Sequence, residues 1–280
     1  MSNHESFPLA GIMGAPVMHS RSPAIHGHWI AEFGLKAAYL PLPISPERLE
    51  KALRALPALG FRGCNLTIPH KVAAMAVMDR VSPQAREIGA MNCVVVEADG
   101  SLSGYNYDGF GFAESLREAE PQFSAASGAA VVLGAGGAAR AIIATLLAEG
   151  TPRIRLVNRT RKAAETLVAG LEGKFDICDW EQRHEALDGA ALVVNTTSLG
   201  MVGEPPLELR LDALNTSALV CDAVYVPLET PLLKAARARG NKGVDGLGML
   251  LNQAPPAFHH WFGVKPEVTP QLRRLIEATL

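Results

Sequence analysis

Cysteines are few in this sequence, and features of a membrane-bound or exported chain are absent. The longest run of small apolar residues, 129–139, ends at Arg140 and is too short to span a bilayer. The N-terminus lacks a basic segment followed by a long apolar stretch, so no signal peptide is expected. No C-x-x-C pair exists, which excludes a zinc ribbon and a dithiol redox motif. We expect a cytoplasmic protein with four reduced cysteines: Cys64, Cys93, Cys178 and Cys221.

An excess of charge of one sign is also absent. The 26 basic and 28 acidic residues give a net charge of -2, so no global field favours nucleic acid or a membrane. The pairs His26/His28 and His259/His260 lack the spacing of a metal site on a helix, and no metal is predicted. With 280 residues, 48% of them hydrophobic, the chain has enough apolar material for about two globular domains.

Short apolar runs alternate with longer amphipathic segments along most of the chain. This alternation predicts repeated βαβ units and an α/β fold. Four hydroxyl residues directly precede a proline and a helix-like stretch, which predicts a capping residue and the first helical position: Ser22, Ser45, Ser82 and Thr269. Asp99-Gly100 predicts a hairpin turn between two strands, and the chain is expected to be wholly helical after residue 246.

A glycine-rich motif marks a nucleotide site in the second half of the chain. Residues 134–139 read G-x-G-x-x-A between the apolar run 131–133 and a helix-like segment. The first glycine permits a tight turn, the second lets the backbone approach a pyrophosphate, and the free N–H groups at the helix start face the anion. Because both flanking elements are of the required kind, dinucleotide binding is favoured over an ordinary turn. From residue 129 the repeated strands and helices predict a doubly wound sheet.

The residues after the next strand favour NADP over NAD. An NAD site normally places Asp or Glu there to accept hydrogen bonds from the ribose, whereas this chain has Asn158, Arg159 and Thr160. A guanidinium flanked by amide and hydroxyl donors suits a 2′-phosphate. The simpler interpretation makes Arg159 a solvated charge and Thr160 a helix cap, and the cap is compatible with phosphate binding.

Hydroxyl, amine and carboxyl groups occur outside this motif where strands give way to helices. Ser20 and Ser22 can donate hydrogen bonds to a carboxylate, although Ser22 alone is better explained as a cap. Lys71 follows an apolar strand and can donate a proton when its surroundings tune its pKa, although a solvated lysine is commoner. Asp108 opens a further helix, where a carboxylate is ordinarily a cap.

The order of these motifs resembles the shikimate dehydrogenase family over nearly the whole chain. The motifs are long and specific: GAPVMHSRSP, NLTIPHK, GAMNC, GYNYDGFGF, VLGAGGAAR, NRT, VNTTSLGM, VCDAVYVPLET and DGLGMLLNQA. The resemblance implies a substrate domain at residues 1–108, completed by C-terminal helices at 246–280, and a Rossmann NADP-binding domain at 109–245. It also implies an oxidoreductase that transfers hydride between NADP(H) and 3-dehydroshikimate, in aromatic amino-acid biosynthesis.

The resemblance assigns roles residue by residue. Lys71 would exchange the proton at the reacting oxygen, paired with Asp108. Substrate carboxylate and ring hydroxyls would be bound by Ser20, Ser22, Thr67, Asn92, Tyr225 and Gln253. Cofactor contacts would come from Gly134, Ala135, Gly136, Gly137, Ala138, Asn158, Arg159, Thr160, Asn195, Thr196, Ser198, Met201, Gly246 and Met249.

Three positions depart from the family pattern. Cys93 and Tyr107 replace the usual threonines beside Asn92 and Asp108, and Ala163 replaces a basic residue for which Arg161 or Lys162 can substitute. Either the changes at Cys93 and Tyr107 are neutral, or they alter substrate preference or reduce turnover. Two alternatives follow: a dehydrogenase of a related ring acid such as quinate or an amino analogue, and a non-catalytic NADP sensor whose cleft Tyr107 fills. Retention of Lys71 and Asp108 weighs against the sensor. The partner is a small-molecule substrate, and the chain is expected to be a monomer or homodimer.

Overall fold

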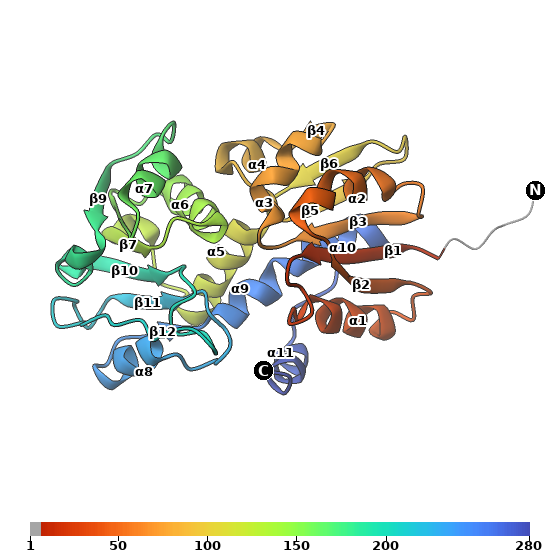
Figure 1. The fold of residues 1–280 in the computed structure, drawn as a ribbon. Coiled ribbons are helices and arrows are strands. Elements are labelled where there is room, and N and C mark those ends of the chain that lie inside the picture. The colour runs from red at the N-terminus through yellow and green to blue at the C-terminus, as the bar shows by residue number, and fades with distance from the viewer. Residues whose placement is uncertain (1–6) are drawn as a thin grey trace, which may run out of the picture. The chain divides into compact units, whose positions relative to one another are not determined.

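The computed structural model describes residues 7–280 and divides them into two compact units (Figure 1). The first unit contains the chain up to Tyr107 and then Gln253–Thr279, and the second contains Asp108–Asn252 together with Leu280. The chain returns to the first unit after Asn252, which is later than the expected domain boundary after residue 245. The reason is that helix α9 (Gly246–Asn252) packs on helix α5 (Asp108–Ala119), where a Cβ on Gly248 would lie 2.9 Å from the Cβ of Ser115.

The first unit is built on a mixed six-stranded sheet of order β2-β1-β3-β5-β6-β4. β1 runs parallel to β2 and β3, whereas β5 runs antiparallel to β3 and β6, and β4 runs parallel to β6. The Asp99-Gly100 turn joins β5 to β6 as predicted. The strands are β1 (Leu9–Gly14), β2 (Ala38–Pro43), β3 (Phe61–Leu66), β4 (Arg80–Val81), β5 (Cys93–Val96) and β6 (Leu102–Tyr105).

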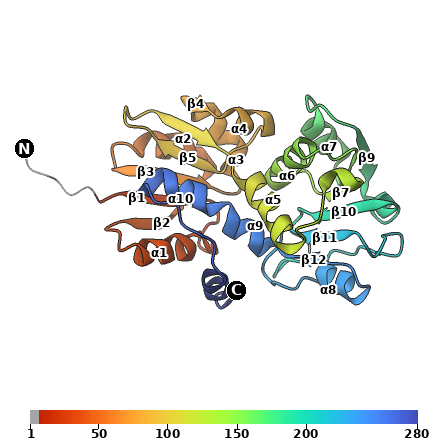
Figure 2. The same cartoon turned by 180° about the vertical axis from the view of Figure 1, so that it is seen from behind.

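Helices cover both faces of this sheet. One apolar cluster joins the sheet to α2, η2 and α4, and another joins it to α1 and α10, of which α10 lies against β3 and β5 (Figure 2). The helices are α1 (Ser22–Glu32), α2 (Leu49–Ala55), α3 (His70–Ala73), α4 (Pro83–Ile88), α10 (Ala254–Phe262) and α11 (Pro270–Glu277), with the 3-10 turns η1 (Pro46–Arg48) and η2 (Ala74–Val77).

The predicted caps formed at two of the four positions. The side chains of Ser82 and Thr269 accept hydrogen bonds from the first turns of α4 and α11. Ser22 instead lies inside α1, whose cap position is Arg21, and Ser45 precedes only the short turn η1 and makes no side-chain capping bond. A proline one residue later is therefore not sufficient to place a cap, because the preceding loop also determines where the helix begins.

The second unit has an all-parallel sheet of order β12-β11-β10-β7-β8-β9. The chain runs outward from β7 to β9, returns to β10 beside β7, and then continues to β12. This is the doubly wound arrangement predicted from the sequence, and its switch point lies between β7 and β10. The strands are β7 (Ala129–Leu133), β8 (Ile154–Asn158), β9 (Phe175–Asp179), β10 (Ala190–Asn195), β11 (Leu219–Asp222) and β12 (Gly243–Val244).

Two apolar clusters cover the faces of this sheet. One joins the strands to α5, α6, α7 and α9, and the other joins them to η5, the segment 207–214 and α8. No helix within residues 7–280 has the length and apolar character needed to cross a membrane. The remaining elements are α6 (Gly137–Ala148), α7 (Arg161–Val168), α8 (Pro231–Ala238), η3 (Ala125–Ser127), η4 (Trp180–Arg183) and η5 (Glu185–Leu187).

Candidate functional site

The turn between β7 and α6 lies at the switch point of the second unit. Gly134 adopts a φ of 104°, which side chains rarely permit, and a Cβ there would lie 2.7 Å from Oγ1 of Thr196. A Cβ on Gly136 would meet no atom of residues 7–280 within 4 Å, so among these residues the turn faces open space directly before the first N–H groups of α6. This arrangement fits a pyrophosphate.

A cavity of about 560 Å³ opens beside this turn. Seven of the predicted cofactor residues line it: Gly134, Ala135, Gly136, Asn158, Arg159, Thr196 and Ser198. Their segments are distant in sequence, but they meet because β7, β8 and β10 are neighbouring parallel strands whose carboxyl ends share one edge.

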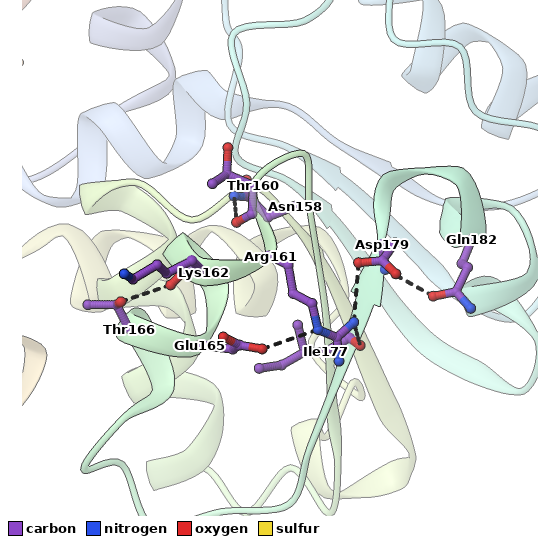
Figure 3. Close-up of polar contacts among 9 residues, drawn as sticks. All are labelled: Asn158, Thr160, Arg161, Lys162, Glu165, Thr166, Ile177, Asp179 and Gln182. Atoms are coloured by element: carbon purple, nitrogen blue, oxygen red, sulfur yellow. Dashed lines mark hydrogen bonds and ion pairs between the residues drawn. The ribbon is translucent and has the colours of Figure 1, made fainter.

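Arg159 is an exposed cation in the wall of this cavity. It follows the last residue of β8, and it makes no hydrogen bond or ion pair within residues 7–280. The Asn158 side chain donates a 2.8 Å hydrogen bond to the carbonyl of Thr160 (Figure 3), which fixes the turn that carries Arg159. Thr160 occupies the cap position of α7 but makes no side-chain capping bond.

Arg161, in contrast, is already paired. Its Nε lies 3.1 Å from Glu165 and its Nη1 lies 3.2 Å from Asp179 (Figure 3). The bond to Asp179 is the main cause that raises the pKa of Arg161. Lys162 is exposed and does not line the cavity. The geometry therefore does not support the expectation that either residue replaces the basic group missing at Ala163.

Seven predicted cofactor residues do not line the cavity. Gly137 and Ala138 begin α6, Gly246 and Met249 lie in α9, and Met201 lies in the loop after β10. Thr160 is not among the residues of the cavity wall, and Asn195 is completely buried. These residues were assigned because they belong to the same sequence motifs as the lining residues. Whether a side chain reaches the cavity also depends on the strand pleat and on the helical position of the residue.

Asn195 belongs to a buried network around Asp222. Asn195 Nδ2 donates to the Asp222 carboxylate at 2.9 Å, the N–H of Val224 donates at 3.0 Å, and the Thr230 hydroxyl donates at 2.7 Å. Asn195 Oδ1 accepts from the N–H of Thr197 at 3.0 Å. Burial raises the pKa of Asp222 above its ordinary value. The network ties the loop after β10, which carries Thr196 and Ser198, to the loop after β11.

Several predicted substrate residues, the predicted proton donor Lys71 and Tyr107 lie near strand ends at one edge of the first sheet. β1 and β3 are parallel and end there, β5 begins there, and β6 ends there. The residues that follow or precede these strand ends are Ser20, Ser22, Thr67, Lys71, Asn92 and Tyr107. The antiparallel strands thus bring segments to an edge where parallel strands alone would bring only the ends of β1, β2 and β3.

Asn92 and Gln253 are in direct contact at this edge. Asn92 Nδ2 donates to Gln253 Oε1 at 3.0 Å, while Asn92 Oδ1 accepts from the N–H of Tyr107 at 2.9 Å. Both amides are buried, with 2% and 6% of their surface exposed. Asn65, which the sequence analysis did not single out, donates to the carbonyl of Asn92 at 3.0 Å and accepts from the Tyr39 hydroxyl at 2.6 Å.

The serine pair and the threonine lie on the loops after β1 and β3. Ser20 Oγ accepts from the N–H of Ser22 at 3.2 Å, so the two residues share one turn. Thr67 packs over Gly14, where a Cβ would lie 2.5 Å from Thr67 Cγ2. His70 is buried, and its Nε2 lies 2.7 Å from the carbonyl of Ile44, so its ring packs inside the first unit.

Lys71 and Asp108 belong to different units. Lys71 is half-buried in the short helix α3, and Asp108 is buried as the first residue of α5. Tyr225 lies in the second unit, after β11. The pairing of Lys71 with Asp108 and the contact of Tyr225 with the substrate stay predictions, whereas Asn92 and Gln253 meet within one unit.

Two separate parts of the chain match sequence models of known protein families. Residues 12–94 match the sequence model described as the shikimate dehydrogenase substrate binding domain, and residues 117–201 match that described as shikimate/quinate 5-dehydrogenase. The chain is 54% identical over 268 residues to shikimate dehydrogenase (NADP(+)) of Paramagnetospirillum magneticum, which covers 96% of this chain and 97% of that protein. The chain belongs to the shikimate dehydrogenase family.

Solved structures show the same similarity. Shikimate 5-dehydrogenase from Thermus thermophilus, in complex with NADP(H) and shikimate, matches with a TM-score of 0.85 and 35% identity over 98% of this chain and 100% of that one. Quinate dehydrogenase from Corynebacterium glutamicum, in complex with NAD, matches with a TM-score of 0.89 and 31% identity over 97% and 99%. The family and the α/β fold predicted from the sequence are confirmed.

The two departures from the family pattern in the first unit are accommodated by packing. The Tyr107 hydroxyl lies 2.7 Å from Nε2 of His260 in α10, and its ring stacks with that of Tyr105 at 6.0 Å. The side chain of Tyr107 is therefore engaged with α10 and β6. Cys93 is buried in the same apolar cluster, and burial raises the pKa of its thiol.

Sequence reasoning missed part of the nucleotide cavity. Trp180 and Arg183 of η4 line it, together with Thr197, Leu199, Glu204, Pro205, Pro206 and Glu208. Trp180 directly follows β9, and this position was a usable signal because ligands of doubly wound sheets bind beyond strand ends. The segment 204–208 carries no comparable pattern, and it reaches the cavity only through the path of the loop after β10.

Proposed function

We propose that this protein reversibly reduces 3-dehydroshikimate to shikimate with NADPH. The observation that carries this proposal is the similarity to shikimate dehydrogenase (NADP(+)) across 96% of the chain, which includes both the nucleotide cavity and the polar sheet edge. The activity was also implied by the motif order. Retention of the lysine and aspartate of that motif order favours an enzyme over a sensor.

The nucleotide cavity supports NADP as the preferred cofactor. β8 ends in Asn158, which offers no carboxylate to a ribose 2′-hydroxyl, and the adjoining Arg159 lines the cavity without a partner in the described chain. A guanidinium binds a phosphate through charge-assisted hydrogen bonds. The Asp179 carboxylate at the end of β9 is bound by Arg161 and therefore does not replace the missing acid.

The polar edge of the first unit supports a hydroxylated ring acid as substrate. We assign the hydroxyls of Ser20 and Ser22 to the substrate carboxylate, and Thr67 with the bonded amides of Asn92 and Gln253 to the ring hydroxyls. Because Asn92 is oriented by the N–H of Tyr107 and the side chain of Gln253, its amide has a fixed direction. Fixed polar groups select a ligand by the hydroxyls it offers. Tyr225 would line the carboxylate end.

Lys71 is the proposed proton donor. NADPH, when bound, supplies a hydride to the ketone carbon, and negative charge develops on the ketone oxygen. The Lys71 ammonium stabilises that charge and transfers one proton from Nζ to the oxygen, which completes the alcohol. Asp108 would pair with the Lys71 ammonium and orient it toward the oxygen. In the reverse direction the neutral amine accepts the proton.

The test follows NADPH absorbance with purified protein offered shikimate and quinate, each with NADP and with NAD. We expect the highest kcat/KM for shikimate with NADP. Faster oxidation of quinate, the substrate named in the similar Corynebacterium glutamicum enzyme, would favour the alternative ring acid. Tight NADP binding without turnover of either acid would favour the sensor.

We further propose that the protein acts in the cytoplasm as a monomer or homodimer. All four cysteines are free, and three of them are buried, which suits a reducing compartment. Light scattering coupled to gel filtration measures the mass against 29.7 kDa per chain, and a mass above that of a dimer would contradict the proposal.

A further inference from the structure

We propose that Arg183 is a second cation for the adenosine 2′-phosphate and that it determines cofactor specificity together with Arg159. This inference rests on the proposed NADP dependence. Both residues line the same cavity, but they come from different elements, since Arg159 follows β8 and Arg183 ends η4 after β9. Neither the glycine motif nor the family motifs include Arg183.

The Arg183 guanidinium is held in a fixed orientation. Its Nε donates to the carbonyl of Glu208 at 2.8 Å, and its Nη1 donates to the carbonyl of Trp180 at 2.9 Å. Its central carbon lies 5.2 Å from the centroid of the Trp180 ring, so one face of the guanidinium is covered. A side chain tethered on three sides loses little further rotamer freedom when it binds a ligand.

Arg183 shares the cavity wall with the acidic residues Glu204 and Glu208, and within residues 7–280 neither forms an ion pair with it. Arg183 is half-buried, and in this part of the chain it forms no ion pair with any other carboxylate; both of its protein acceptors are neutral backbone carbonyls. Nη2 makes no hydrogen bond in the same part of the chain. A half-buried guanidinium that lines a cavity and has donors left over is suited to bind an anion through charge-assisted hydrogen bonds.

The other basic residues near the end of β8 do not supply this second charge. Arg161 is committed to Glu165 and Asp179 (Figure 3), Lys162 lies outside the cavity wall, and position 163 is alanine. Arg183 thus offers, from the neighbouring strand end, the charge that the family usually places on α7.

Phosphate is favoured over the adenine ring as the group that Arg183 contacts. Stacking on adenine uses a face of the guanidinium, and Trp180 already covers one face. Hydrogen bonding to a phosphate uses the edge, and the Nη2 edge is the part left without a protein partner. The two roles predict different binding results, because the adenine is present in NAD and NADP whereas the 2′-phosphate is present only in NADP.

The experiment measures binding of 2′,5′-ADP and of ADP by calorimetry to the full-length wild type, Arg183→Gln and Arg161→Gln. We expect Arg183→Gln to weaken the binding of 2′,5′-ADP by about tenfold or more and the binding of ADP by less than about twofold. We expect Arg161→Gln to change neither affinity by more than about twofold. Equal weakening of both ligands by Arg183→Gln, or no weakening, would overturn the proposal.

Two further variants separate the possible failures. Arg183→Lys keeps the charge but loses the tether, so it is expected to retain part of the preference for 2′,5′-ADP; a loss as large as in Arg183→Gln would show that charge is not the cause. Arg159→Gln tests the proposed function itself. If the wild type does not prefer 2′,5′-ADP over ADP, the NADP assignment fails; if it does and only Arg159→Gln removes the preference, the role of Arg183 alone fails.

Discussion

Lys71 stands in the short helix α3 after β3, at the polar edge of the first sheet. We predict that Lys71→Ala lowers kcat by about 10²-fold to 10⁴-fold with a modest change in substrate affinity, because the amine acts on charge that develops in the transition state. Steady-state kinetics with shikimate and NADP measure both constants. Lys51→Ala, which removes an exposed lysine of α2, is the matched control. Turnover near that of the wild type would remove Lys71 from the mechanism.

His26 is a buried histidine of the first unit that the proposed chemistry does not use. Its ring stacks with Tyr39 at 4.2 Å, and within residues 7–280 neither ring nitrogen has a hydrogen-bond partner. Burial lowers its pKa to about 3. The unfolded chain therefore binds a proton at this position between about pH 6.5 and pH 3, whereas the folded chain does not, and stability falls as the pH is lowered through that range.

Replacement of His26 is predicted to reduce the acid sensitivity of the fold. Between pH 7 and pH 5 this histidine lowers the free energy of unfolding by about 2 kcal/mol. His26→Phe keeps an aromatic ring against Tyr39 and removes this pH-dependent loss. Urea unfolding at pH 7 and pH 5 measures the difference, with the exposed His259→Gln as the control. Equal losses of stability on acidification in the wild type and His26→Phe would show that His26 titrates normally.

At the scale of elements, a substitution in the β7–α6 turn is expected to affect cofactor binding without affecting the stability of the fold. A Cβ on Gly136 meets no atom of residues 7–280 within 4 Å and its φ of -91° suits any residue, so Gly136→Ala is predicted to leave the melting temperature almost unchanged. The added methyl enters the space assigned to the pyrophosphate, and NADP binding should weaken by about tenfold or more. Calorimetric titration checks this, and unchanged affinity would place the pyrophosphate elsewhere.

The loops after β10 and β11 depend on one buried carboxylate. Asp222→Ala leaves the partners Asn195, Thr230 and the N–H of Val224 without an acceptor, so we predict a loss of about 3 kcal/mol or more in the free energy of unfolding. Asp222→Asn keeps one acceptor oxygen and removes the cost of burying a charge that the raised pKa reveals, and its loss should be much smaller. Chemical unfolding at pH 7 compares them; equal losses would contradict the network.

The sequence predicts the position of a residue well when a local motif at a strand end determines it. It predicts the position poorly when contacts with distant segments determine it. Gly134, Asn158 and Arg159 line one cavity, as expected for strand ends that meet at the edge of a doubly wound sheet, and their contacts with the cofactor stay predictions. Asn195 was assigned to the cofactor, but it is buried and bonded to Asp222. Arg183 was missed because its position depends on the carbonyls of Trp180 and Glu208, which no local pattern reports.

At the scale of the whole molecule, periodicity and motif order predicted the fold class and the family. The boundary between the units was harder to predict, because α9 continues a helical C-terminal segment yet packs on α5. The sequence pattern of α9 describes an apolar helix but does not specify the unit on which that helix packs. Which unit it joins is decided by close contacts such as that of Gly248 with Ser115.

The most direct test of the account is the rate of NADP reduction by the purified wild-type protein with shikimate, compared in one experiment with Lys71→Ala. The account predicts rapid reduction by the wild type and a loss of about 10²-fold or more in the variant, with 2′-phosphate-dependent cofactor binding intact in both. Absence of shikimate oxidation by a folded, NADP-binding wild type would contradict it.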